Sequence, residues 1–170
     1  MNPIQQGISL TVATSSGVTE GIINRNVISW DDIPYALPPM GDLRWKAPSP
    51  LVSPESQIKP QEGNGCLQEA SIYAGIQGKG IVGQEDCLYL DIKTPLNKDY
   101  SNQNLPVMFW IHGGGNTSGI KDYYNFSELI RKHQVLVVTI NYRLGPMGWF
   151  THPAIQGLQD GLDKTSNFGT

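Results

Sequence analysis

Residues 105–111 read LPVMFWI and lead directly into His112-Gly113-Gly114-Gly115. Seven mostly large apolar residues without polar alternation predict a strand that is buried on both faces, as in a parallel sheet. The three glycines free the backbone to turn sharply, and no side chain covers their N–H groups. Such a loop can place N–H donors about 3 Å from a developing negative charge, as an oxyanion hole requires.

Two other uses of a glycine-rich loop are excluded by the neighbouring residues. A dinucleotide-binding fingerprint reads G-x-G-x-x-G, but Ser118 stands where its third glycine belongs and Gly119 comes one residue late. The acidic residue expected at the end of the next strand is missing, since that strand ends at Ile140-Asn141. A phosphate-binding loop needs Gly-Lys-Ser/Thr, and Lys121 has no such neighbours. A plain glycine-rich turn remains the alternative to an oxyanion-binding loop.

Apolar periodicity predicts the other elements. Residues 123–133 form the clearest helix, in which Phe126, Leu129 and Ile130 share one face and basic residues occupy the last turn. A β-branched run at residues 135–140 predicts a buried strand, so strand, helix and parallel strand make a βαβ crossover and an α/β fold. The remaining expectations are strands at residues 8–14, 18–23 and 26–30 in a small antiparallel meander, an irregular segment at 34–60, a glycine-rich loop at 63–83 and a strand at 88–93.

Composition narrows the class of protein. A length of 170 residues allows one domain with a hydrophobic core. The net charge of −3 is too small to predict a nucleic-acid partner or binding to an anionic membrane surface. No apolar run approaches the roughly 18 residues of a transmembrane helix. The first residues, MNPIQQ, carry no visible secretory signal, so the default expectation is a cytoplasmic location.

Cysteine usage leaves the redox compartment open. Cys66 and Cys87 are the only cysteines, and without nearby histidines they make no closed metal site, so no metal is expected. Two interpretations stay open. One is a disulfide, which suits a secreted or periplasmic protein, and the other is a pair of reduced, partly buried thiols.

Five segments in a fixed order resemble a known family. They are WDDIPYALPPMGDLRWKAPSP at residues 30–50, EDCLYLDI at 85–92, HGGG at 112–115, NYRLGPMGWF at 141–150 and NFG at 167–169. In this order and spacing they resemble the type-B carboxylesterases, which include the cholinesterases. An HGGG loop is an oxyanion-hole motif of esterases and lipases. The resemblance runs from about residue 9 to residue 170.

The resemblance implies an α/β-hydrolase fold of which residues 1–170 are the N-terminal portion of a single domain. We therefore expect a small antiparallel meander followed by the first strands of a central mixed sheet. The family's serine lies in a G-x-S-x-G turn soon after NFG, and the triad follows in the order Ser, Asp/Glu, His. No G-x-S-x-G occurs here, because Thr11 stands where Gly7-Ile8-Ser9 would need its closing glycine. All three triad members are expected beyond Thr170.

The resemblance also implies roles for residues in the loop. The backbone N–H groups of Gly114 and Gly115 correspond to oxyanion-hole donors, and His112 supports the loop without acting as the catalytic base. His112, Gly113 and Asn116 are expected beside the substrate. Asn116 departs from the family, which usually has an apolar or aromatic residue there, and we expect its amide to cap the turn.

Two structural pairs follow from the same resemblance. Cys66 and Cys87 correspond to the family's first disulfide, and a loop of that size stabilises by roughly 3 kcal/mol in the chain-entropy model. Arg44 and Glu85 correspond to a buried ion pair that ties the proline-rich segment to the disulfide loop. The physical reason is that Arg44 lies between Leu43 and Trp45, so its charge needs a partner if it is buried.

The expected function is hydrolysis of a small-molecule carboxylic ester through an acyl-enzyme, without a cofactor. Choline esters are not expected as substrates, since no tryptophan lies between the cysteines to hold a quaternary ammonium. One alternative is an esterase-like binding or adhesion domain without catalysis, against which the intact HGGG argues. The other alternative is a truncated product with no activity of its own. The 170-residue chain alone is expected to be inactive, because all three triad residues are expected beyond Thr170.

Overall fold

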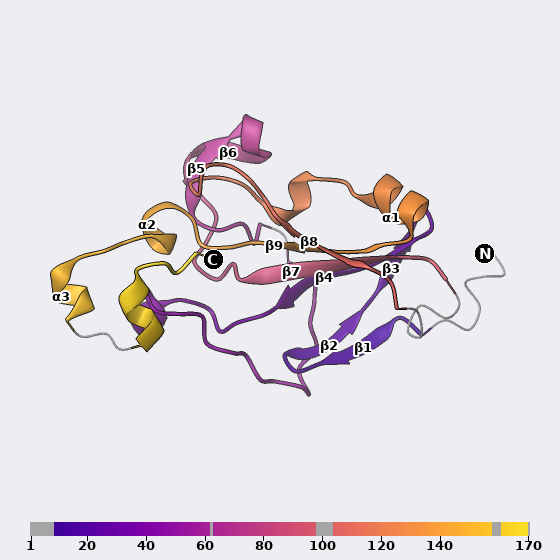
Figure 1. The fold of residues 1–170 in the computed structure, drawn as a ribbon, viewed down its shortest axis with the longest axis horizontal. Coiled ribbons are helices and arrows are strands. Elements are labelled where there is room, and N and C mark those ends of the chain that lie inside the picture. Colours follow the sequence, from indigo (N-terminus) through magenta and orange to yellow (C-terminus); the bar gives the residue numbers. More distant parts are fainter. Residues whose placement is uncertain (1–8, 62, 98–103, 158–160, 170) are drawn as a thin grey trace.

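The computed structural model describes residues 9–61, 63–97, 104–157 and 161–169, and its centre is a five-stranded sheet flanked by two small hairpins (Figure 1). The strands are β1 (Thr11–Thr14), β2 (Gly17–Glu20), β3 (Ile22–Asn24), β4 (Val27–Pro34), β5 (Gln68–Ser71), β6 (Ile76–Val82), β7 (Tyr89–Pro95), β8 (Val107–Ile111) and β9 (Leu136–Ile140). The α-helices are α1 (Ser127–His133), α2 (Gly145–Gly148) and α3 (Pro153–Gln156), and short 3-10 helices are η2 (Gly41–Leu43), η3 (Ile72–Ala74), η5 (Lys121–Tyr123) and η6 (Gly161–Thr165).

The central sheet is mixed and has the strand order β3-β4-β7-β9-β8. β8 and β9 run parallel, with Phe109 opposite Val138, and α1 lies between them in the sequence. The other neighbouring strands are antiparallel. The βαβ crossover and the mixed sheet predicted from the sequence are confirmed.

The predicted apolar face of the helix packs on one side of this sheet. Ile130 is fully buried against Val27 and Val137, and Phe126 and Leu129 pack around them. The α-helix begins at Ser127, later than the predicted residue 123. The reason is local, because the Asn125 side-chain oxygen accepts the Ser127 N–H at 2.9 Å and so satisfies a free donor at the helix start.

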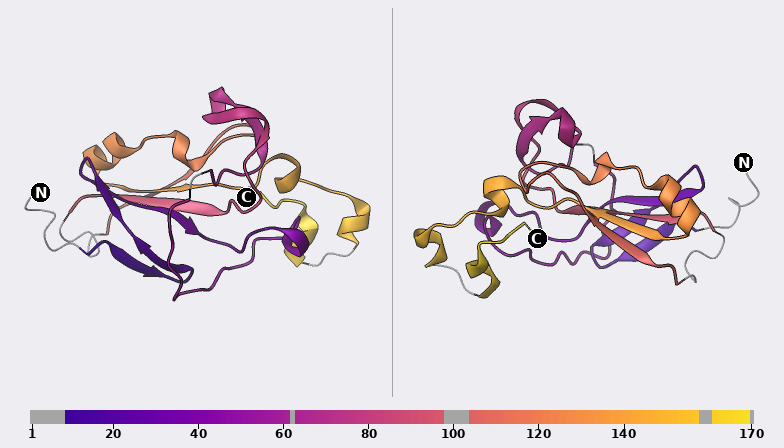
Figure 2. Two further views of the ribbon diagram at one scale, coloured as in Figure 1. Left: turned by 180° about the vertical axis from the view of Figure 1, so that it is seen from behind. Right: turned by 45° about the horizontal axis from the view of Figure 1, so that its top comes forward.

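The opposite face of the sheet is covered by the N-terminal hairpin, and Figures 1 and 2 show α1 and the β1–β2 hairpin on opposite sides. Trp30 and Ile33 pack there against Val12, Ile58 and Leu90, among other apolar side chains. The predicted meander is therefore divided between two sheets. β1 and β2 pair with each other, whereas β3 and β4 join the central sheet, since β4 also pairs with β7. Of the predicted strand 8–14, the first residue lies outside the described residues.

β4 also runs further than predicted, because a bulge carries it past residue 30. The register moves from Trp30 opposite Ile92 to Ile33 opposite Leu90. Asp32, in the bulge, has the left-handed φ of 58° and donates its N–H to the Asp91 carboxylate at 2.9 Å. The side chain of Asp91 thus replaces the carbonyl that a regular ladder would supply.

The prediction of a loop at residues 63–83 is wrong in part. β5 and β6 form a hairpin within it, with Gln68 opposite Val82 and Ser71 opposite Ile76. Most of the β6 side chains are exposed, and glycines occur among them. A strand is predicted from alternating apolar and polar residues, and these exposed strands have no such alternation. The sequence therefore contains no signal for the hairpin.

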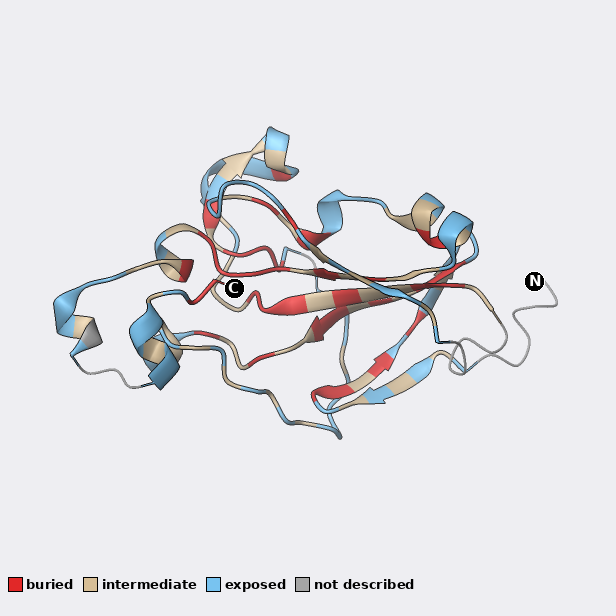
Figure 3. Ribbon diagram, viewed as in Figure 1, coloured by how far each residue is buried: buried red, intermediate tan, exposed pale blue. Residues whose placement is uncertain are grey.

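β8 is an edge strand, and the prediction that both of its faces are buried is wrong. Met108 and Trp110 are partly covered, whereas Val107, Phe109 and Ile111 are 64%, 56% and 49% exposed. Nothing among the described residues covers that face, and β8 pairs only with β9 within the described sheet. Figure 3 shows the contrast with the buried stretches of β4 and β7. An apolar strand with an open edge is prone to pair with another chain.

We predict that the 170-residue chain self-associates through β8. Val107→Lys combined with Phe109→Lys should shift size-exclusion elution towards the monomer, since lysine on an edge strand opposes intermolecular pairing. Ile22→Lys, at the 53% exposed start of β3, is the matched control and should leave the elution unchanged. A wild-type chain that elutes as a monomer at all concentrations contradicts this prediction.

Candidate active site

His112 anchors the start of the glycine loop. It follows the last residue of β8, is only 3% exposed and stacks on Tyr142 with ring centroids 4.4 Å apart. The Tyr142 hydroxyl donates to the His112 carbonyl at 2.6 Å, which holds the backbone at the same point. The loop thus leaves the sheet from a fixed position.

The same burial determines the charge of the imidazole. Burial lowers the pKa of His112, and no carboxylate among the described residues pairs with the ring. His112 Nδ1 lies 2.9 Å from the Gly113 carbonyl, so the ring donates through Nδ1, and its lowered pKa favours the neutral form. A neutral ring bonded to its own loop fits the supporting role predicted for His112.

The next residues adopt conformations that depend on glycine. Gly114 has a φ of 122° and Gly115 a φ of 60°. The Gly114 carbonyl accepts the N–H groups of Thr117 and Ser118 at 3.1 and 3.2 Å, so the loop closes on itself. The N–H groups of Gly114 and Gly115 donate to no acceptor among the described residues and are available to a ligand.

Asn116 continues this turn, but not as predicted. It has a φ of 61°, a conformation that asparagine tolerates better than most residues, and its carbonyl accepts the Gly145 N–H at 2.7 Å. The amide is exposed and caps no turn formed by described residues. The left-handed backbone therefore accounts for asparagine here.

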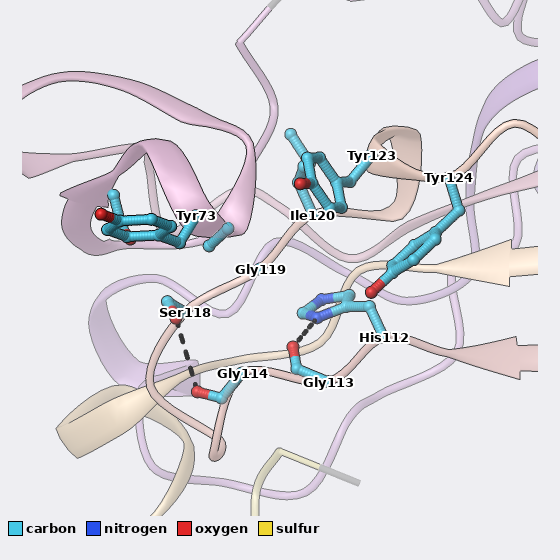
Figure 4. Close-up of a pocket in the computed structure, with 11 residues that line it drawn as sticks. Tyr73, His112, Gly113, Gly114, Ser118, Gly119, Ile120, Tyr123 and Tyr124 are labelled. Carbon is cyan, nitrogen blue, oxygen red and sulfur yellow. Dashed lines mark hydrogen bonds between the residues drawn. The ribbon is translucent and has the colours of Figure 1, made fainter.

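An open pocket of about 240 Å³ lies against the loop (Figure 4). His112, Gly113 and Gly114 form one wall, whereas Gly115 and Asn116 lie outside the lining. The remaining lining residues come from the β5–β6 hairpin and from the segment after the loop; they are Ser71, Tyr73, Ala74, Ser118, Gly119, Ile120, Tyr123 and Tyr124. The pocket thus combines backbone donors with an aromatic rim.

A disulfide between Cys66 and Cys87 holds the base of the hairpin that forms the rim. Both cysteines are buried with Leu88, Tyr142 and Leu144 in one apolar cluster. The disulfide is the pairing implied by the sequence, and neither cysteine is a free thiol. It connects the hairpin to the residues that support His112.

The Arg44–Glu85 pair is also present. Arg44 donates through Nε and Nη2 to the two carboxylate oxygens of Glu85 at 2.7 and 2.6 Å. The pair is only partly buried, since the two side chains are 38% and 19% exposed. It joins the proline-rich segment to the disulfide loop, as expected, but at the surface.

A buried ion network that the sequence did not reveal lies below the loop. Lys121 is 1% exposed, and its Nζ lies 2.8 Å from a carboxylate oxygen of Asp32 and 2.8 Å from one of Asp91. A third carboxylate, Asp122, lies 3.0 Å away and is half exposed. Lys93 lies 3.5 Å from Asp91 on the outer side of the network.

Hydrogen bonds extend this network into a closed ring. The Lys121 N–H donates to the Asn141 side chain at 2.9 Å, and Asn141 donates to the Asn64 carbonyl at 3.1 Å. The Asn64 side chain in turn donates to Asp32. The ring joins β4 and the ends of η5 and β9 to the segment before Cys66. Most of its polar groups are paired within the protein, whereas Asp91 Oδ2 is buried without a hydrogen bond from the described residues and has only Lys93 at 3.5 Å.

The charges shift one another's pKa values. Burial lowers the pKa of Lys121, but the carboxylates of Asp91, Asp122 and Asp32 outweigh it and raise this pKa. Burial raises the pKa of Asp91, but the Lys121 ammonium outweighs it and the pKa of Asp91 is lowered. Burial and the nearby Asp91 raise the pKa of Asp122 to about 6, even though Lys121 opposes the shift.

The comparisons with known proteins agree with this architecture. Residues 8–159 match the model of the carboxylesterase family. The chain belongs to the carboxylesterase family. It is 40% identical over 148 residues to a fumonisin B1 esterase of Sphingopyxis macrogoltabida and 38% identical over 141 residues to a para-nitrobenzyl esterase of Bacillus subtilis. These alignments cover 84% and 81% of the chain but 26% and 28% of the relatives.

Solved carboxylesterases share the fold. A thermophilic para-nitrobenzyl esterase superposes with a TM-score of 0.77 at 34% identity, over 93% of this chain and 34% of that one. A carboxylesterase of Geobacillus stearothermophilus gives a TM-score of 0.74 at 28% identity, over 94% of this chain and 32% of that one. The chain therefore has part of the α/β-hydrolase fold, and its sheet corresponds to the N-terminal strands of that fold. It spans about a quarter of the length of the curated relatives that it matches.

We predict that Lys121→Met destabilises the protein by roughly 3–5 kcal/mol, because it leaves two buried carboxylates without their cation. Equilibrium urea unfolding measures this loss. Lys132→Met, on the exposed side of α1, is the matched control and should change the unfolding free energy by under about 0.5 kcal/mol. Equal urea midpoints for the two variants would show that the network does not stabilise the fold.

The raised pKa of Asp122 predicts a pH dependence. Between its ordinary value of 3.8 and about 6, the folded state binds the Asp122 proton more tightly than the unfolded state. The free energy of unfolding therefore falls as the pH rises through this window. Asp122→Asn removes that titration and should flatten the curve, as measured by urea unfolding at pH 4 to 7. Asp42→Asn, at an exposed position, should keep the wild-type slope.

Proposed function

We propose that this chain supplies the oxyanion hole of a carboxylic ester hydrolase that works through a serine acyl-enzyme. The observation that carries the proposal is the HGGG loop, in which two N–H groups have no acceptor among the described residues and one of them borders a pocket. Membership of the carboxylesterase family and the esterases among its relatives support the same reaction.

In this proposal the loop stabilises the charge that forms during acyl transfer. When a serine attacks the ester carbonyl, its proton passes to the triad histidine and the electron pair of the C=O bond moves to oxygen, where the N–H groups of Gly114 and Gly115 donate to the oxyanion. The C=O bond then re-forms as the C–O bond to the alcohol breaks, and the histidine returns the proton to the leaving alcohol. The donors are fixed before the reaction by the bonds within the loop, so little reorganisation accompanies the charge. Neutral His112 holds the loop and transfers no proton in the reaction. The mechanism needs no cofactor.

The serine, the acid and the histidine are proposed to come from sequence after Thr170, within the same domain. The absence of G-x-S-x-G from residues 1–170 and the quarter length relative to the curated relatives support this assignment. The exposed face and open edge of β8 are a suitable place for further strands of the sheet.

The lining of the pocket supports an uncharged small-molecule ester as the substrate. Besides glycines it consists of three tyrosines, two serines, one isoleucine, one alanine and His112, and none of these side chains carries a carboxylate or an ammonium. The disulfide supports an oxidising compartment as the place of action, such as a periplasm or the extracellular space. No α-helix among the described residues has the length and apolar character needed to cross a membrane.

The decisive experiment compares the complete protein that carries this chain with residues 1–170 alone. The complete protein should hydrolyse p-nitrophenyl acetate and become labelled by a fluorophosphonate on the serine of its G-x-S-x-G. Residues 1–170 should do neither, since an oxyanion hole without an activated nucleophile has no intermediate to stabilise. A complete protein without hydrolysis or labelling refutes the function, and turnover by residues 1–170 refutes the placement of the triad.

We predict that Gly115→Val in the complete protein lowers kcat by about 10²–10³-fold, as loss of one oxyanion donor does. The side chain has open space, but valine is strained at a φ of 60° and the N–H is expected to turn away. Gly41→Val is the matched control, because Gly41 has a φ of 55°, open space and no place in the pocket. Similar kcat values for the two variants count against Gly115 as a donor.

A further inference from the structure

The loop is held at two ends, and the buried Lys121 lies at the second end. The first end is His112, which stacks on Tyr142. The second end is the segment from Gly119 to Lys121. Gly119 lies so close to the His112 ring that a Cβ on it would come within 2.1 Å of Nδ1. The two ends of the loop therefore meet at the imidazole.

The proposed donor Gly114 is coupled to the second end of the loop. Its carbonyl accepts the Ser118 N–H at 3.2 Å, and a Cβ on Gly114 would come within 1.8 Å of the Ser118 carbonyl oxygen. Gly119 is fixed in turn by Gln68, which accepts its N–H at 2.7 Å and donates to its carbonyl at 2.9 Å. A shift of the segment after Ser118 must therefore move Gly114 as well.

The Lys121 ammonium is a further, charged anchor of this segment. It is almost fully buried between Asp32 on the bulge of β4 and Asp91 on β7, both at 2.8 Å. The bulge costs backbone strain, since Asp32 is not glycine and has a φ of 58°. That strained conformation puts one carboxylate against Lys121 and lets it also accept the Gln61 N–H at 2.7 Å. Because it is buried and bonded on two sides, the ammonium is held between the two carboxylates.

We propose that Lys121 is a positioning residue for the oxyanion hole: clamped by Asp32 and Asp91, it holds Gly119 against His112 and so fixes the N–H groups of Gly114 and Gly115. The inference rests on the proposed esterase function and adds a residue that touches neither substrate nor reacting atoms. Displacing catalytic groups by about 1 Å through a remote change can lower the rate by about 10²-fold. Lys121 acts on kcat because the donors matter most when charge has developed on the oxygen.

The test uses Lys121→Met in the complete protein, with kcat expressed per active site after titration with a fluorophosphonate. Titration removes the contribution of unfolded molecules, so a purely structural role leaves this kcat unchanged. We expect kcat for p-nitrophenyl acetate to fall by about 10- to 10²-fold while KM changes little. The Ki of phenylboronic acid, which forms a tetrahedral adduct on serine, should rise by a similar factor.

Lys93→Met is the matched control, because it also removes an ammonium next to Asp91 but from the outer side of the network. It should leave kcat per active site within about twofold of the wild type. If Lys121→Met does not fold, Asp32→Asn serves instead, since asparagine tolerates the left-handed backbone and keeps one acceptor oxygen while it removes the negative charge beside Lys121. This variant should lower kcat per active site several-fold.

The outcomes separate the two proposals. An active wild type with an unchanged kcat per active site in Lys121→Met, or in Asp32→Asn where that variant replaces it, overturns the positioning role and leaves the esterase function intact. A kcat in Lys93→Met as low as that of Lys121→Met also overturns it, because the effect would then come from charge alone. A complete wild-type protein that hydrolyses no ester and binds no fluorophosphonate refutes the function itself.

Discussion

Removing a lysine ammonium from water is costly, and this chain compensates the cost at Lys121 with two carboxylates that each lie 2.8 Å away. The compensation constrains the backbone around it. Asp32 reaches the ammonium only because β4 bulges, and the bulge is tolerated because Asp91 accepts the free N–H of Asp32. One ion network thus connects three parts of the structure. They are the bulge of β4 at Asp32, the inward-facing Asp91 of β7 and Lys121 at the end of the glycine loop.

The glycine loop is held by contacts with residues that lie outside it. Its own residues are mostly glycine, which has the largest conformational entropy in the unfolded chain. Order comes from Tyr142 at the first end, Gln68 and Lys121 at the second, and Gly145, which donates to the Asn116 carbonyl. Free N–H groups on a fixed backbone are what charge stabilisation requires, because donors that had to reorient during the reaction would lose most of their effect.

Several features could be predicted from the sequence because they depend on local signals or on motifs. The apolar run before HGGG, the β-branched run at residues 135–140 and the helix with Ile130 on its buried face gave the βαβ unit correctly. The motifs gave the Cys66–Cys87 and Arg44–Glu85 pairs. The β5–β6 hairpin was missed because its exposed strands carry no alternation. β8 was taken as buried because an apolar run has the same sequence whether or not another element covers it.

The fold class, the family motifs and the glycine loop are evident in the sequence, because each motif is a short run of neighbouring residues. Only the tertiary structure brought Lys121, Asp32 and Asp91 together, since they are far apart in the sequence and lie in segments with no shared periodicity. A lysine after a loop and two aspartates in strands look like solvated surface charges until the bulge of β4 turns one of them inward. The physical reason is that burial depends on what covers a residue, and that is decided by contacts between distant segments.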